Sequence, residues 1–157
     1  MKWVTSDHHF GHERIIELER PQFKSLTEMN NFMIEKWNSV VAQIDTVYHL
    51  GDFALGLSEE EMTDLMNSLN GNIILIRGNH DRMGKKKLIN FGFVNVVNRI
   101  EIGSCILTHK PIQGDLLGDK INVHGHTHTR NLESEKHINV SVEQTEYLPI
   151  KLELLMI

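Results

Sequence analysis

The sequence predicts an α/β fold in which two mixed sheets pack face to face with helices outside. In the first half of the chain, short apolar runs alternate with amphipathic segments, as expected for strands joined by helices. In the second half, short apolar runs follow one another with only turns between them. The 157 residues are close to the usual length of one domain, so we expect a single domain over residues 1–157.

Three strands and three helices are expected in the first half. The segment that follows Ser58 begins with a capping box, Ser58 and Glu61, and continues with a regular apolar stripe. The run at 72–77 is almost continuously apolar, which is typical of a strand buried on both faces. The expected strands are 2–6, 46–50 and 72–77, and the expected helices are about 27–41, 58–69 and 85–90.

The second half is expected to be mostly strand. Its apolar runs are too short for helices and are separated by turn residues, without a linker or a repeat. The expected strands are 94–102, 105–108, 121–123, 138–142 and 148–155.

Composition excludes several classes of protein. The 16 basic and 21 acidic residues give a net charge of −5, which argues against a broad surface for duplex nucleic acid. The single cysteine, Cys105, excludes an internal disulfide framework. No apolar run approaches the roughly 18 residues of a membrane helix, and Asp7 comes too early for a signal peptide. We therefore expect a cytoplasmic protein without a membrane partner.

Polar side chains follow five of the expected strands at the point where each strand ends. In open α/β sheets, functional groups gather at the carboxyl ends of the strands, so we expect these side chains to converge. Histidine, the commonest metal ligand, is prominent among them, and the chain has 10 histidines. The residues are Asp7 and His9, then Asp52, then Asn79 with His80 and Asp81, then His109, and finally His126 with His128.

The spacing of these residues suits metal binding. Asp7 and His9, like His126 and His128, are two apart and so lie on the same side of an extended backbone. Glycines before Asp52, Asn79 and His126 permit sharp turns. Two Asp, one Asn and four His exceed the needs of one tetrahedral ion, and the mixed ligand types suit two divalent transition metals. Such pairs of ions clamp phosphoryl groups and generate hydroxide at neutral pH.

The same motifs resemble those of the calcineurin-like metallophosphoesterases, and they occur in the same order. The similarity runs from Asp7 to His128, and it is closest to the compact bacterial and phage members of the family. The matching blocks are Asp7-His8-His9, Gly51-Asp52, Gly78-Asn79-His80-Asp81, Thr108-His109 and Gly125-His126-Thr127-His128.

The resemblance implies a fold, a cofactor and a reaction. The fold would be a four-layer α/β/β/α sandwich, and the reaction would be ester hydrolysis by a hydroxide between two metal ions. Mn²⁺ is the ion we expect, with Fe, Zn, Ni or Co as alternatives. His80 would protonate the leaving oxygen, and Asp81 would orient it. The first ion would be bound by Asp7, His9 and His128, the second by Asn79, His109 and His126, and Asp52 would bridge them.

Three further residues are candidates for binding substrate phosphate, namely His12, Lys110 and Arg130. Each has an ordinary alternative: His12 as a polar residue at a helix start, and Lys110 and Arg130 as solvated charges. His8 and His49 are expected to be packed histidines rather than ligands, because each alternates with functional or apolar neighbours.

The function predicted from the sequence is metal-dependent hydrolysis of a phosphomonoester or phosphodiester in a small phosphorylated substrate. Two alternatives stay open. A nuclease acting on DNA or RNA ends would normally carry more positive charge or an extra domain. A catalytically silent scaffold would have lost ligands, and this chain keeps them all. The sequence leaves the oligomeric state open.

Overall fold

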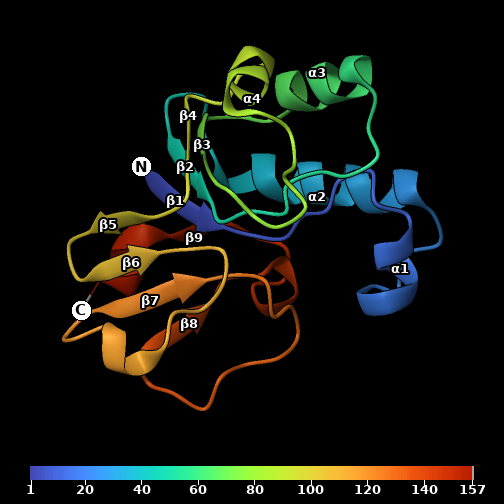
Figure 1. Ribbon diagram of the computed structural model, residues 1–157. Coiled ribbons are helices and arrows are strands. Elements are labelled where there is room, and N and C mark those ends of the chain that lie inside the picture. Colours follow the sequence, from blue (N-terminus) through green and yellow to red (C-terminus); the bar gives the residue numbers. More distant parts are fainter. Residues whose placement is uncertain (157) are drawn as a thin grey trace.

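The computed structural model describes residues 1–156 and contains two mixed sheets that pack face to face (Figure 1). The first sheet has the order β4-β3-β2-β1-β9 and the second has the order β5-β6-β7-β8. The predicted α/β fold with two mixed sheets is therefore confirmed.

The first sheet aligns the carboxyl ends of its parallel strands. β1 (Lys2–Thr5), β2 (Thr46–His49), β3 (Asn72–Ile76) and β4 (Asn95–Val97) run parallel to their neighbours, and β9 (Ile150–Lys151) is antiparallel to β1. In the register, Thr5 lies opposite His49, and His49 lies opposite Leu75. The segments that follow β1, β2 and β3 therefore leave the sheet side by side.

Four α-helices pack on the side of this sheet that faces away from β5–β8 (Figure 1). They are α1 (Arg14–Glu19), α2 (Leu26–Val40), α3 (Glu59–Ser68) and α4 (Lys85–Phe91). Ser25 caps α2 by accepting the Glu28 N–H, and α3 begins with the complete Ser58–Glu61 capping box. Among residues 1–156, no helix combines the length and the apolar character needed to cross a membrane.

The second sheet contains the strands β5 (Ile100–Ile102), β6 (Cys105–Leu107), β7 (Ile121–His124) and β8 (His137–Asn139). β5 is antiparallel to β6, and the other neighbours are parallel. Its outer face is covered by the segment 110–120, which includes the short 3₁₀ helix Gly114–Leu116 and the buried Leu117. Asn122 on this face accepts the Ile112 N–H at 2.8 Å, which ties that segment to the sheet.

The alternation of side chains along the strands separates two hydrophobic cores. Trp3 and Val47 pack under the helices, with Met29, Met33 and Trp37 of α2. The intervening positions face the second sheet and form the core between the sheets, with Val4, Tyr48, Leu50, Ile76, Cys105, Leu107, Val123, Val140 and Leu152.

Three of the strand predictions are wrong in their extent. The predicted strand 94–102 is two strands in different sheets, because the chain crosses between the sheets at 98–99. The predicted strand 138–142 ends as β8 at Asn139, and a 3₁₀ helix, Val142–Gln144, follows. The predicted strand 148–155 is the two-residue β9 and then the 3₁₀ helix Leu152–Leu155. The six-residue helix α1 is too short to give an apolar period and was not predicted.

We predict that Ser58→Ala lowers the free energy of unfolding by about 1 kcal/mol, because the first turn of α3 loses its side-chain acceptor. For a chain of this length, that change corresponds to a decrease in Tm of about 2–4 °C. Differential scanning calorimetry checks it. Ser39→Ala in α2 is the matched control, because that exposed hydroxyl only bonds back to the Lys36 carbonyl of its own helix. Equal Tm values for the two variants would contradict the capping role.

Candidate metal centre

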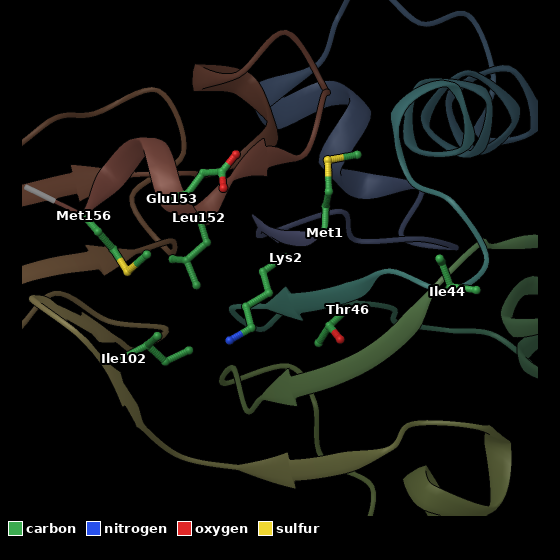
Figure 2. Close-up of a pocket in the computed structure, with 8 residues that line it drawn as sticks. All are labelled: Met1, Lys2, Ile44, Thr46, Ile102, Leu152, Glu153 and Met156. Carbon is green, nitrogen blue, oxygen red and sulfur yellow. The ribbon is translucent and has the colours of Figure 1, made fainter.

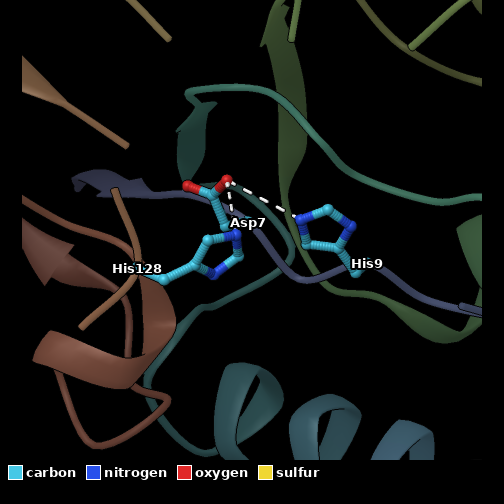
Figure 3. Close-up of side chains that lie close together, drawn as sticks. All are labelled: Asp7, His9 and His128. Carbon is cyan, nitrogen blue, oxygen red and sulfur yellow. Dashed lines mark ion pairs between the residues drawn. The ribbon is translucent and has the colours of Figure 1, made fainter. Parts of the chain in front are cut away.

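The carboxyl ends of the two sheets meet, and two groups of histidine and aspartate side chains lie there. Ser6, directly after β1, pairs with Ser141 beyond β8, which joins the sheets at this point. Asp7, His9 and His128 form one cluster, hereafter the first group, which is drawn in Figure 3. Asp52, His109 and His126 form the second group. In each group, the potential ligand atoms lie within 4.8 Å of one another.

The first group has the donor set of a divalent metal site. Asp7 Oδ1 lies 3.8 Å from His9 Nε2 and 3.9 Å from His128 Nε2 (Figure 3). Asp7 is fully buried, and its Oδ1 and His9 Nε2 have no hydrogen-bond partner in the described structure. Buried polar atoms without partners are costly, and a bound cation would satisfy them. Carboxylate and imidazole ligands fit Mn²⁺, Fe²⁺ or Zn²⁺.

The second group contains one more donor, the side-chain amide of Asn79. His109 Nε2 lies 2.9 Å from Asn79 Oδ1, 3.2 Å from His126 Nδ1 and 3.5 Å from Asp52 Oδ2. The other ring nitrogen of His109, Nδ1, donates to the Leu50 carbonyl at 2.8 Å. This bond leaves Nε2 as the nitrogen that is free to ligate, as is usual for histidine ligands.

Asp52 lies between the two groups. Its Oδ2 is 3.5 Å from His9 Nε2 of the first group and 3.5 Å from His109 Nε2 of the second. Its Oδ1 points away from both and accepts the His80 N–H at 2.9 Å. One oxygen is thereby fixed by the backbone, and the other faces both groups.

The backbone of the candidate ligands is strained. Within the described residues 1–156, seven residues other than glycine have positive φ, and five of them are in the two groups. Such φ values are unfavourable for residues with a side chain and are concentrated at functional sites. The five angles are 61° at Asp7, 51° at His9, 53° at Asp52, 68° at His126 and 48° at His128.

Of the three glycines before Asp52, Asn79 and His126, Gly51 has a positive φ, whereas Gly78 and Gly125 do not and are required by space alone. A Cβ at Gly78 would overlap the backbone nitrogen and carboxylate of Asp52. A Cβ at Gly125 would overlap the side chains of Ser6 and Asp7. Sharp turning was the predicted reason for Gly78 and Gly125, but close approach of two loops is the reason that the structure gives.

Burial and charge set the protonation of the site. Burial, followed by the charges of His109 and Lys110, lowers the pKa of His126 to about 4. Burial also lowers the pKa of His9 far below its usual value and raises that of Asp7. Burial would lower the pKa of His128 too, but the hydrogen bond and charge of Glu143 outweigh it and raise that pKa. Neutral His9 and His126 are in the form that ligates metal.

The structure places His80 beside the two groups, but Asp81 does not orient its ring. His80 Nε2 is 3.9 Å from Asp52 Oδ2, and its Nδ1 has no hydrogen-bond partner. Asp81 instead accepts the backbone N–H groups of Asp52, Phe53 and Gly78 at 2.8–3.0 Å. The expected contact is therefore wrong, and Asp81 fixes the loops that carry Asp52 and Asn79.

The three candidate phosphate-binding residues have different surroundings. His12 lies at the edge of the site, with its Nδ1 3.3 Å from His9 Nδ1 and its ring 5.9 Å from that of His80. Lys110 is exposed and lines a groove next to Asn79 and His109. Arg130 is exposed on the loop after His128, and within residues 1–156 its side chain forms no hydrogen bond or ion pair.

Several residues that support the site were missed by sequence reasoning. Ser141 donates to Asp7 Oδ2 at 3.1 Å, and Glu143 accepts from His128 Nδ1 at 3.1 Å. Asn139 donates to the His128 carbonyl at 2.9 Å. These residues are two apart and alternate with the buried Val140 and Val142. This alternation of polar and buried apolar residues was the pattern in the sequence that could have identified the three supporting residues. No pattern in the sequence indicates the role of Arg20, which pairs with Glu143.

His8 and His49 are packed histidines, as expected. Both are fully buried, and His49 Nε2 lies 2.9 Å from His8 Nδ1.

A separate hollow, drawn in Figure 2, is lined by the first residues of β1 and β2, Lys2 and Thr46, together with Ile102 and Met156. It lies at the opposite ends of these strands from the two groups and is not part of the site.

Comparison with known sequences agrees with the motifs. The sequence model of the calcineurin-like phosphoesterase family matches residues 3–154. The uncharacterized protein MJ1445 of Methanocaldococcus jannaschii is 35% identical, over 98% of this chain and 88% of its own. The gene 66 protein of Mycobacterium phage L5 is 30% identical, over 87% of this chain and 81% of its own.

Solved structures show the same fold. A protein of unknown function from Aquifex aeolicus, AQ665, superposes with a TM-score of 0.77 at 26% identity, covering 99% of this chain and 97% of its own. The nuclease MPE of Pseudomonas putida superposes with a TM-score of 0.58 at 20% identity, covering 81% of this chain and 61% of its own. At this identity, the similarity shows a shared fold and nothing more. With its fold, its two Asp/His groups and a match over nearly its whole length, the chain belongs to the calcineurin-like phosphoesterase family.

Proposed function

We propose that this protein is a hydrolase that cleaves phosphate esters with two divalent metal ions, Mn²⁺ being the expected pair. The observation that carries the proposal is the position of Asp52 Oδ2, 3.5 Å from a ligating nitrogen of each group. A single carboxylate oxygen between two sets of histidines is suited to bridge two ions.

The residues of each group have a defined role in this proposal. Two bound ions would polarise the phosphoryl oxygens and activate a water molecule as the nucleophile. Asp7 and Asp52 would balance the charge of the ions, and His9 and His126, whose pKa values are lowered by burial, would be neutral ligands. The first ion would be bound by Asp7, His9 and His128, the second by Asn79, His109 and His126, and Asp52 would bridge them.

His80 is suited to give a proton to the leaving oxygen. Its main chain is fixed, because its N–H donates to Asp52 Oδ1. Its side chain is 31% exposed, so a substrate can reach the ring. Its Nδ1 is buried, so the nitrogen that would face a leaving group is Nε2, which lies 3.9 Å from Asp52 Oδ2. These features support a general acid rather than a metal ligand.

The groove beside the second group is suited to an anionic part of the substrate. Lys110, Asn98 and Thr108 line it together with Asn79 and His109. Arg77 also lines the groove, and its Nη1 is held by the Asp81 and Met83 carbonyls at 2.7 and 2.6 Å. Lys110 is exposed in the same groove, so it is the cation that we propose to bind phosphate.

The substrate that we propose is a small phosphorylated molecule rather than duplex nucleic acid, because the net charge is −5. The experiment is a panel of phosphomonoesters, phosphodiesters and short DNA and RNA ends, each assayed with added Mn²⁺. Hydrolysis of small esters is expected. Hydrolysis of the nucleic-acid ends alone would favour the nuclease alternative, and no hydrolysis of any substrate would favour a silent scaffold.

We predict that Asp52→Ala binds at least one ion fewer than the unchanged protein and loses activity, because one oxygen faces both groups. Elemental analysis of Mn²⁺-loaded protein should give close to two ions per chain before the substitution. Glu59→Ala is the control, since this exposed carboxylate pairs only with Lys87 and should leave the count unchanged. A count of one or zero in the saturated, unsubstituted protein would contradict the dinuclear centre.

We predict that His80→Ala slows turnover by about 10²–10⁴-fold, the usual contribution of a positioned general acid. Metal content should not change, because the backbone N–H that fixes Asp52 is retained. The loss should be smaller for nitrophenyl esters, whose leaving group departs without a proton. The measurement is kcat for activated and unactivated esters, together with metal content.

The same assays on His12→Ala test the neighbouring histidine as the rival acid, since the two rings are 5.9 Å apart. If His80→Ala loses metal, or slows both kinds of ester equally, the assignment is wrong.

A further inference from the structure

The guanidinium of Arg20, at the end of α1, is completely buried next to the first group. Its Nη1 donates to the His8 carbonyl at 2.6 Å, and its Nη2 donates to the Asp7 carbonyl. Because these two carbonyls belong to the turn that presents Asp7 and His9, Arg20 fixes that turn from behind. The turn contains two of the strained φ angles, so it requires such support.

Arg20 also forms an ion pair with Glu143, and Glu143 contacts a candidate ligand. Glu143 Oε1 lies 2.9 Å from Arg20 Nε and 2.8 Å from Nη2. The same oxygen accepts from His128 Nδ1 at 3.1 Å. The bond fixes the ring of His128 so that Nε2 faces Asp7 Oδ1, and the negative charge makes the imidazole a better donor.

One ion pair thus contacts every part of the first group. Arg20 fixes the backbone of Asp7 and the peptide before His9, and Glu143 fixes the ring of His128. The second group is supported by different partners: the Leu50 carbonyl fixes His109, and Asp81 fixes the backbone at Asp52 and Gly78. Among the hydrogen bonds of residues 1–156, neither Arg20 nor Glu143 contacts a member of the second group.

We propose that Arg20 and Glu143 are positioning residues that set the metal affinity of the first group and leave that of the second group unchanged. The inference rests on the proposed dinuclear centre. A buried ion pair is weak evidence for stability in itself, because desolvation offsets the attraction between the charges. In this pair, however, the same Glu143 oxygen binds both Arg20 and the candidate ligand His128. The pair can therefore orient that ligand, which a purely structural ion pair would not do.

The test is a titration of metal-free protein with Mn²⁺, with bound ions counted by electron paramagnetic resonance. In Glu143→Ala, one of the two ions should bind about 10–100-fold more weakly, the usual effect of removing an outer partner of a histidine ligand. The signal of the spin-coupled ion pair should then appear only at correspondingly higher Mn²⁺. Glu143→Gln, which keeps the shape and an acceptor oxygen, should lie between Glu143→Ala and the unchanged protein.

Asp45→Asn is the matched control for loss of a buried carboxylate. Asp45 is 3% exposed, pairs with the amino terminus and accepts from Trp3 Nε1 at 2.8 Å, and it lies at the other end of β2. This variant should lower Tm and leave both Mn²⁺ affinities unchanged. If Asp45→Asn and Glu143→Ala weaken metal binding equally, the weakening comes from general destabilisation of the fold, and the proposal is overturned.

Combination with ligand variants identifies which ion is affected. In His128→Ala, the added Glu143→Ala change should have a smaller effect than in the unchanged protein, because its contact with His128 is already lost and only its contact with Arg20 is left. In His109→Ala, the same change should weaken the ion that is left. Additive losses with His128→Ala, or unchanged affinity in Glu143→Ala and Glu143→Gln, would overturn the inference. Fewer than two ions in the unchanged protein would instead contradict the proposed function.

Discussion

A fully buried carboxylate, that of Asp7, is the constraint on which the rest of the site depends. Its Oδ2 accepts the His126 N–H at 2.8 Å and the Ser141 hydroxyl at 3.1 Å, so two groups that follow strands of the second sheet bind a carboxylate that follows the first sheet. Its Oδ1 has no hydrogen-bond donor among residues 1–156 and faces two imidazoles. A buried charge requires compensation, which a cation at this point would supply. The contact that joins the sheets therefore leaves Oδ1 of the same carboxylate available to a metal ion.

The strained loops are held in place by backbone hydrogen bonds between neighbouring loops. The Asp7 N–H donates to the Gly51 carbonyl and the His9 N–H to the Asp52 carbonyl, both at 3.0 Å. The Gly125 N–H donates to the His109 carbonyl at 3.0 Å. A left-handed residue with a side chain costs on the order of 1–3 kcal/mol and persists only where its surroundings fix it. The parallel register of β1 and β2 supplies these surroundings, because it brings the two turns side by side.

Local patterns in the sequence were enough to predict the sheets and the convergence of ligands, but not the contacts between distant segments. The end of each strand, with its polar residues, is visible in a few neighbouring positions. The pairing of Arg20 with Glu143 joins residues 123 positions apart, and no local period marks it. The role of Asp81 was mistaken for the same reason: its adjacency to His80 suggested a contact, whereas the fold brings three backbone N–H groups to its carboxylate. The sheet change at 98–99 likewise depends on packing, since both sides of it are equally suited to strands.

The two groups are supported by different residues, and this difference has a physical consequence. Around the second group, Asp81 and the Leu50 carbonyl bind the main chain or one ring, within loops that follow adjacent strands. Around the first group, support comes from the side chains of Arg20 and Glu143, which lie outside both sheets, beyond the strands of each. Both groups depend on single side chains, since Asp81 acts through its side chain as Arg20 and Glu143 act through theirs, but the two groups share none of these residues. A substitution of Glu143 is therefore expected to act on the first group and a substitution of Asp81 on the second, without a change in the sheets.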